Sequence, residues 1–178
     1  MRSDGAEVIE RGGAGRELHD FASFYDDQFV SMVRLATLTI GQPEVARDIV
    51  QDAFVGLHDR WNRVDFPKAY VRRSVINGCR SRMRWERIRH PLATTTPGLD
   101  PGERAVDQVV DEMTDVLAVL SVRQRAAVVL KFYEQRTEVE IADAIGCRPG
   151  SVGPLVSRAL VKLRNELGDW RDLEGGTS

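Results

Sequence analysis

Hydrophobic residues recur at helical spacing along most of this 178-residue chain. An apolar stripe from Leu18 to Ile40 predicts a first helix, which Gly41-Gln42-Pro43 ends. Pro43 suits the first turn of a second helix, because a proline there removes no helical hydrogen bond. The second helix turns its apolar residues inward as far as Trp61, and a third helix covers Tyr70–Arg89.

A segment rich in proline and glycine follows, which has no periodicity and predicts a linker. Helical periodicity resumes in the second half of the chain. Ser121 with Gln124, and Thr137 with Glu140, are capping boxes that start two helices. A last helix covers Pro149–Leu167. No alternating strand pattern is visible, so the predicted class is all-α, with two small helical domains joined by a flexible linker. The predicted segments are a disordered N-terminal extension (1–16), a first domain (17–90), the linker (91–110), a helix-turn-helix domain (111–170) and a tail (171–178).

Charge is strongly segregated, although the formal net charge is only −2. Residues 60–90 hold ten Lys and Arg against two acids, whereas residues 100–120 hold six acids against one arginine. In the third helix the basic and polar residues share one face and the apolar residues the opposite one. A solvated surface helix is the alternative, but the acids that usually interleave such a face are nearly absent, which favours a nucleic-acid backbone as partner. The shared face comprises Tyr70, Arg73, Asn77, Arg80, Arg84 and Arg87.

Several classes of function are not indicated by the sequence. Cys79 and Cys147 lie far apart without ligand-spaced partners, so neither a disulfide framework nor a zinc site is predicted. The three histidines are scattered and no glycine-rich phosphate loop is present. We therefore expect no enzymatic activity, no metal and no cofactor. The longest apolar run is too short to cross a bilayer and the N-terminus lacks a hydrophobic signal core, so a cytoplasmic location is expected.

The segment from Thr137 to Leu167 has the layout of a helix-turn-helix, with a small residue, Ala142, at the helix crossing and Gly146 in the turn. Such a motif presents its second helix to the major groove of DNA. A plain αα-hairpin with solvated cations is the alternative. A helical wheel leaves five residues facing away from the apolar side: Ser151, Pro154, Leu155, Arg158 and Lys162.

Together, the aromatic-rich first helix, the ARDIVQDAFVGLH helix, the arginine helix, the linker and the C-terminal helix-turn-helix resemble one family. The chain is similar to sigma factors of the extracytoplasmic-function (ECF) group, the two-domain branch of the sigma-70 family, and within it to the SigE-like actinobacterial subset. The resemblance covers about residues 18 to 168. It implies an initiation subunit of bacterial RNA polymerase with no chemistry of its own.

The resemblance also implies partners and site residues. The expected partners are core RNA polymerase, through the clamp of its largest subunit and the flap of its second subunit, and promoter DNA. An anti-sigma factor is a further candidate, and direct membrane insertion is not expected. The expected polymerase-binding residues are Asp48, Gln51, Asp52, Phe54 and Val55. Those expected at the minus-ten element are Trp61, Tyr70, Arg73, Asn77, Arg80 and Arg84, and the helical-wheel residues above are expected at the minus-thirty-five element.

The recognition helix departs from the family pattern at one place. Gly150-Ser151-Val152 and Ser157 to Leu160 match the family, but Gly153 and Pro154 stand where many members have lysine and serine. Pro154 is harmless if the helix begins near Ser151 and kinks it if the helix begins at Pro149. A helix-turn-helix regulator that is not a polymerase subunit is the main alternative function. A protein that only sequesters a partner is a third.

Overall fold

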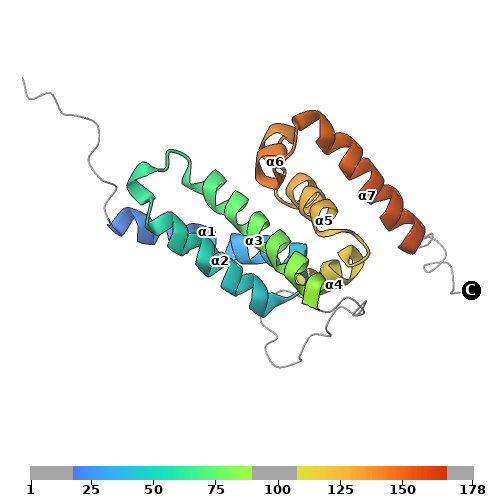
Figure 1. Cartoon of the computed structure of the whole chain (residues 1–178), viewed down its shortest axis with the longest axis horizontal. Helices are drawn as coiled ribbons and strands as arrows, with labels where there is room; N and C mark the ends of the chain where they lie inside the picture. Colours follow the sequence, from blue (N-terminus) through green and yellow to red (C-terminus); the bar gives the residue numbers. More distant parts are fainter. Residues whose placement is uncertain (1–17, 90–107, 168–178) are drawn as a thin grey trace, which may run out of the picture.

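The computed structural model describes residues 18–89 and 108–167, and these ranges contain helices and their connections without any strand (Figure 1). The all-α class is therefore confirmed. The helices of the N-terminal group are α1 (Leu18–Ile40), α2 (Pro43–His58), the short 3-10 helix η1 (Trp61–Arg63) and α3 (Pro67–Arg89). The C-terminal group contains α4 (Gln108–Leu117), α5 (Val122–Val128), η2 (Val129–Tyr133), α6 (Glu138–Ile145), η3 (Pro149–Ser151) and α7 (Val152–Leu167). The predicted N-terminal extension and tail, and most of the predicted linker, lie outside the described residues.

Local sequence signals account for most helix ends. Gly41 adopts a φ of +79° and its N–H donates to the Thr37 carbonyl at 2.7 Å, which terminates α1. Pro43 lies in the first turn of α2. Both predicted capping boxes are formed, at the starts of α5 and α6. Two boundaries differ from expectation: α2 ends at His58, so that Trp61 belongs to η1, and α4 begins at Gln108, within the predicted linker.

The helix that begins at Val122 ends in a π-helical turn, η2, which the periodicity did not predict. The Glu134 N–H donates to the Val129 carbonyl at 3.0 Å, and Gln135 follows with a φ of +53°. The wider turn rotates Phe132 and Tyr133 outward, so both rings are exposed. It also directs Glu134 toward α3.

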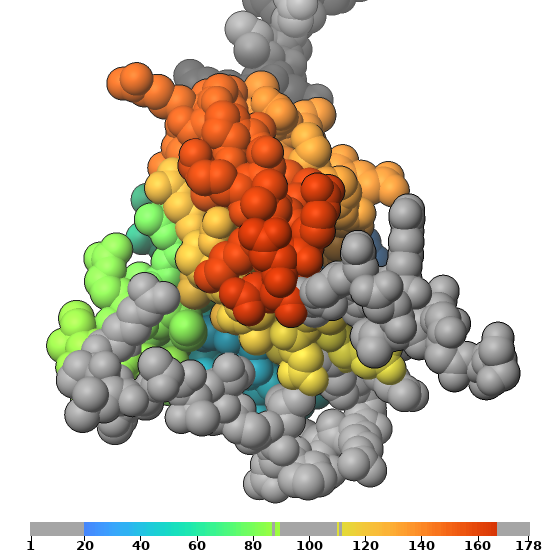
Figure 2. All heavy atoms as spheres, turned by 90° about the vertical axis from the view of Figure 1, so that its right-hand side faces the viewer, coloured from blue at the N-terminus to red at the C-terminus, as the bar shows by residue number. Residues whose placement is uncertain are grey.

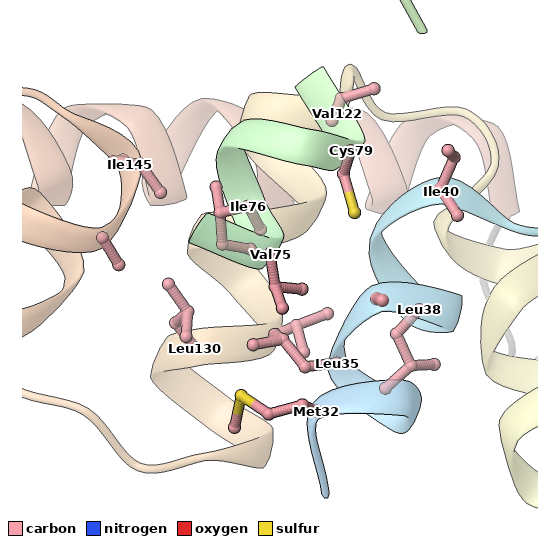
Figure 3. Close-up of a cluster of buried hydrophobic side chains, with 14 of the residues drawn as sticks. Met32, Leu35, Leu38, Ile40, Val75, Ile76, Cys79, Val122, Leu130 and Ile145 are labelled. Carbon is pink, nitrogen blue, oxygen red and sulfur yellow. The ribbon is translucent and has the colours of Figure 1, made fainter. Parts of the chain in front are cut away.

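The two groups of helices pack against each other around one continuous apolar core (Figure 3). Leu35 and Leu38 of α1 and Ile76 of α3 belong to the same buried cluster as Leu130 and Ile145 of the C-terminal group. In Figure 1, α3 runs alongside α2 on one side and α5 and α6 on the other. The sequence predicted both groups of helices, but it did not predict that they would share a core.

Candidate nucleic-acid interfaces

Helix α3 places the predicted polar face in two different environments. Asn77 and Arg84 are exposed. Arg73 and Arg80 instead contact α6: Arg73 Nη1 lies 3.4 Å from the carboxylate of Asp143, and Arg80 Nη1 donates to the Ile145 carbonyl at 3.0 Å. The basic face is therefore partly free and partly occupied by the chain itself.

The two aromatic residues predicted for the minus-ten element both make contacts within the chain. Trp61 is buried, with its ring 5.2 Å from Phe21 and 5.3 Å from Phe24, so it supports α1 and cannot stack on a base in this arrangement. The Tyr70 hydroxyl donates to the Gly56 carbonyl of α2 at 3.3 Å. The family motif located Trp61 and Tyr70 along the chain, but it did not indicate the directions of their side chains.

Two exposed aromatic residues near the ends of α3 were not predicted as site residues. Phe66, just before the helix, is 78% exposed. Trp85 is also exposed, and the Arg89 guanidinium lies over its ring at 4.2 Å. Exposed aromatic rings beside guanidinium groups are typical of surfaces that bind single-stranded nucleic acid. The neighbouring arginines in the sequence, such as Arg82 and Arg89, could have indicated Trp85 as a candidate nucleic-acid-binding residue.

The outer face of α2 presents a mixed patch of acidic, amide and apolar groups. Asp48, Gln51 and Asp52 are exposed, and Val55 is 62% exposed. Phe54, predicted as a contact residue, is buried among the rings of α1, since it lies on the inner side of α2. Gln51, Phe54 and Val55 line a hollow of about 330 Å³ together with Phe21, Tyr25 and His58. The patch therefore combines a polar rim with an apolar hollow, which is the composition expected of a protein interface.

The helix-turn-helix consists of α6, a turn through Gly146 and a second helix, α7. Gly146 has a φ of +67°, a conformation that favours glycine. Pro154 is the third residue of α7, where its missing N–H would have no helical partner, so the helix is not kinked there. Pro149–Ser151 form the separate 3-10 turn η3, so the α-helix begins after Ser151 and not at Pro149.

Helix α7 lies across the outside of the molecule (Figure 2). Ser151, Pro154, Arg158 and Lys162 are exposed, as predicted from the wheel. Leu155 is half-buried and packs against the core, which corrects its placement on the outward face. The outward set predicted from the wheel is thus more polar than the sequence indicated, because Leu155 does not belong to it.

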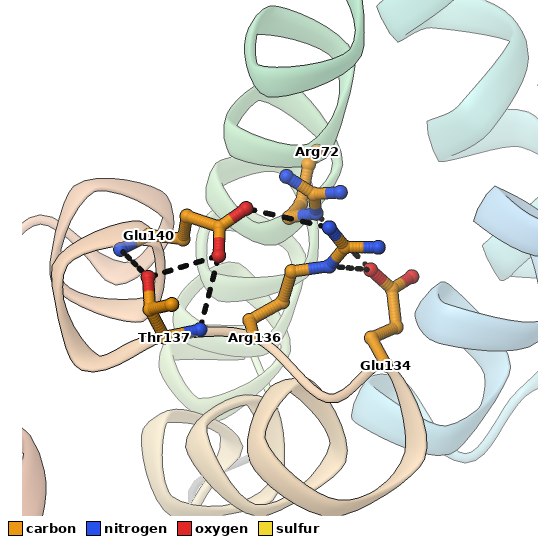
Figure 4. A network of polar contacts seen from close by, with 5 residues as sticks. All are labelled: Arg72, Glu134, Arg136, Thr137 and Glu140. Atoms are coloured by element: carbon orange, nitrogen blue, oxygen red, sulfur yellow. Dashed lines mark hydrogen bonds and ion pairs between the residues drawn. The ribbon is translucent and has the colours of Figure 1, made fainter.

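A polar network joins α3 to the turn before α6 (Figure 4). Arg72 Nε donates to Glu134 Oε2 at 3.1 Å, and Arg136 bridges Glu134 and Glu140 at 3.3 Å each. The backbone N–H of Thr137 donates to Glu140 at 3.0 Å and lowers the pKa of that carboxyl, with smaller contributions from the Thr137 hydroxyl and Arg136. The network orders the start of the helix-turn-helix and attaches it to α3.

Other site chemistry is not found in the part of the chain that the structure describes. No three His, Cys, Asp or Glu side chains are grouped as a metal site would need, over residues 18–89 and 108–167. Within the same residues no helix is long and apolar enough to cross a membrane.

Known proteins share both the sequence and the fold of this chain. The family profile described as "Sigma-70, region 4" matches residues 111–163. The RNA polymerase sigma-E factor of Streptomyces coelicolor is 33% identical over 85% of this chain and 88% of its own length. This chain belongs to the ECF sigma factors of the sigma-70 family. The ECF RNA polymerase sigma factor SigM of Mycobacterium tuberculosis is 29% identical over 94% of this chain and 86% of its own length.

The fold of this chain is also found in a solved sigma factor structure. The sigma factor RpoE of Bartonella quintana, in complex with the anti-sigma factor NepR, superposes with a TM-score of 0.69 at 21% identity, covering 84% of this chain and 98% of that one. The profile match and the 33% identity to the Streptomyces coelicolor factor confirm the family named from the sequence motifs. They also confirm the main prediction of function, an RNA polymerase sigma factor. The sigma factors are transcription initiation factors.

Proposed function

We propose that this sigma factor binds core RNA polymerase and directs it to promoters by two separate DNA contacts. Helix α7 recognises the duplex minus-thirty-five element, and the polar face of α3 holds the melted minus-ten element. The observation that supports this division is that one chain carries an exposed recognition helix and, on another helix, a basic face with an exposed amide. A regulator that only binds duplex DNA has no use for the second surface.

The outer face of α2 is the proposed contact with polymerase. Asp48, Gln51 and Asp52 supply polar contacts to the clamp of the largest subunit, and Val55 adds apolar area beside the hollow. Phe54 contributes by lining that hollow. A second contact, between the C-terminal group and the flap of the second subunit, rests on the family resemblance alone.

The minus-ten contact is proposed to run along α3. Asn77 carries an amide that can pair with a base edge once that base has left the stack, and Arg84 can bind the phosphate backbone. Arg73 and Arg80 join them only after their contacts with α6 are broken. The N-terminal group is thus the sigma region 2-like domain of residues 17–90.

The minus-thirty-five contact is proposed to rest on α7, in the region 4-like domain of residues 111–170. Arg158 is exposed and can donate two hydrogen bonds to a guanine in the major groove. Lys162 and Ser151 flank it and can reach phosphates. Pro154 presents apolar surface that suits a thymine methyl group, and Leu155 supports the helix from its inner side.

An anti-sigma factor is also proposed as a partner, since the Bartonella quintana neighbour was solved with one. Its contacts on this chain are not assigned.

Co-elution with purified core polymerase tests the polymerase contact. Wild type should co-elute, and Asp48→Arg combined with Gln51→Ala should not, because a repulsive charge at a packed interface costs about 2–5 kcal/mol. Asp65→Arg makes the same charge reversal at an exposed position off α2 and should bind normally. If the chain instead shifts promoter duplex strongly without polymerase and never co-elutes, the helix-turn-helix regulator is the better description.

A further inference from the structure

The N-terminal part of the helix-turn-helix carries an excess of negative charge. From Thr137 to Ser157 the chain has three acids, all of them on α6, and a single basic residue, Arg148. The phosphate backbone of DNA attracts cations and repels carboxylates. A charged side chain that binds a phosphate from this part of the motif must therefore be Arg148.

The first turn of α7 offers no side chain for such a contact. Residues Val152 to Val156 include no charged residue, and Pro154 also lacks a backbone N–H. A Cβ atom on Gly153 would lie 3.6 Å from Glu138 Oε1, so a carboxylate stands beside this turn. Lys131, from η2, lies 3.7 Å from the same oxygen and is engaged there. A phosphate that approached Gly153 would thus meet an acid on α6 and no cation on α7.

Arg148 has a free guanidinium. It is exposed, and it forms no ion pair, hydrogen bond or ring contact with another residue of the ranges 18–89 and 108–167. The preceding arginine in the chain, Arg136, is in contrast bound to Glu134 and Glu140 at 3.3 Å each. The acids near the start of α6 therefore occupy Arg136 and leave the charge of Arg148 available to a ligand.

The backbone around Arg148 is held on both sides. Pro149 restricts the residue before it to extended backbone, and Arg148 has a φ of −76° and a ψ of 143°. The Arg148 carbonyl accepts a hydrogen bond from the Ser151 N–H at 2.9 Å, and the Cys147 N–H donates to the Ala142 carbonyl at 2.9 Å. The turn therefore presents Arg148 at a fixed place between α6 and α7, which reduces the entropy lost on binding.

We propose that Arg148 holds a backbone phosphate of the minus-thirty-five element and so positions α7 in the major groove. A planar guanidinium can donate two parallel hydrogen bonds to one phosphate. Phosphate contacts fix the register and orientation of a protein on the duplex but carry no sequence information. Arg148 is thus a positioning residue, and Arg158 is the residue that reads a base. The inference rests on the function proposed above for α7.

The affinity of core polymerase with this chain (the holoenzyme) for promoter DNA tests this inference. The first probe is a fluorescent duplex that the wild-type holoenzyme selects from a random-sequence library. The second probe is the same duplex, shortened so that it ends downstream of the minus-thirty-five element. Arg148→Ala removes the proposed contact. Arg123→Ala is the matched control, because it removes an exposed arginine of α5, outside the helix-turn-helix.

On the longer probe, Arg148→Ala should bind about tenfold more weakly than Arg123→Ala at about 50 mM salt, because it loses a charge-assisted hydrogen bond. The salt slope should fall by about one, so that this difference shrinks about threefold by about 200 mM salt. Arg148→Lys keeps the charge but not the two-donor geometry, so its slope should equal that of wild type and its affinity should be intermediate. On the shortened probe, Arg148→Ala and Arg123→Ala should bind equally.

Two results would overturn the inference. One is an affinity of Arg148→Ala within twofold of Arg123→Ala on the longer probe. The other is a loss of the same size on the shortened probe, which would place Arg148 against polymerase and not against upstream DNA. Failure of the proposed function would appear differently, as a wild-type holoenzyme that binds both probes equally. In that case α7 makes no promoter contact, and the inference fails with it.

Discussion

Replacing Gly78 by alanine should destabilise the protein, although alanine is normally the better helix former. Gly78 lies within α3 at its crossing with α2, and a Cβ atom there would lie 2.6 Å from Ile49 Cγ2 and 3.6 Å from Ile49 Cβ. Cγ2 branches directly from Cβ, so it cannot move without a change of rotamer or a shift of the helices. Overpacking costs about 1–3 kcal/mol, and the helix propensity of alanine returns about 1 kcal/mol. The expected net loss is therefore up to about 2 kcal/mol.

Chemical denaturation followed by circular dichroism measures this loss. Gly56→Ala in α2 is the control, because its Cβ would meet the Tyr70 hydroxyl at 3.6 Å and Arg60 Nη1 at 4.0 Å, both ordinary contact distances. This variant should gain about 0.5–1 kcal/mol. Ile49→Ala removes the clashing Cγ2, so Gly78→Ala with Ile49→Ala should be at least about 1 kcal/mol more stable than the sum of the single effects. A Gly78→Ala variant as stable as Gly56→Ala would refute the close crossing of α2 and α3, which sets the proposed polymerase and DNA surfaces relative to each other.

Four further predictions address DNA binding and the helix-turn-helix. Asn77→Ala should slow open-complex formation, measured by permanganate footprinting, more than initial promoter binding; equal loss at both steps would make Asn77 structural. Arg158→Ala should cost about 1–3 kcal/mol on the preferred minus-thirty-five element and relax one position in a promoter library, whereas uniform loss would indicate a phosphate contact. Thr137→Ala should cost about 0.5–2 kcal/mol of stability in denaturation, and an unchanged midpoint would argue against the capping box. The pKa of Glu140 is lowered in the folded state, so its carboxylate stabilises the fold fully above about pH 4.5. This stabilisation is lost as the pH falls through the folded-state pKa. Glu140→Gln should therefore make the free energy of unfolding depend less on pH in this acid range.

The sequence predicted the parts of the fold that depend on short-range chemistry. The capping boxes at Ser121 and Thr137 and the helix-breaking Gly41 act within one turn of the chain, so each could be read directly from spacing. The outward residues Arg158 and Lys162 followed from helical periodicity alone, because one side of α7 is apolar.

The remaining features depend on contacts between residues far apart in the chain. Phe54 and Trp61 match positions in a motif, but the aromatic rings of α1 decide that both side chains point inward. The π turn that brings Glu134 to Arg72 has no periodic signature. The same holds for the packing of α6 on α3, since an isolated acid such as Asp143 does not reveal which cation it meets. The predicted roles in DNA and polymerase binding stay predictions.

In vitro transcription with purified core polymerase tests the central claim most directly. Core polymerase is supplied with a library of genomic fragments, with and without this chain, and the 5′ ends of the transcripts are sequenced. The account predicts start sites that appear only with the chain, share elements near minus thirty-five and minus ten, and disappear with Asp48→Arg combined with Gln51→Ala. A set of start sites that is the same with and without the chain would contradict it.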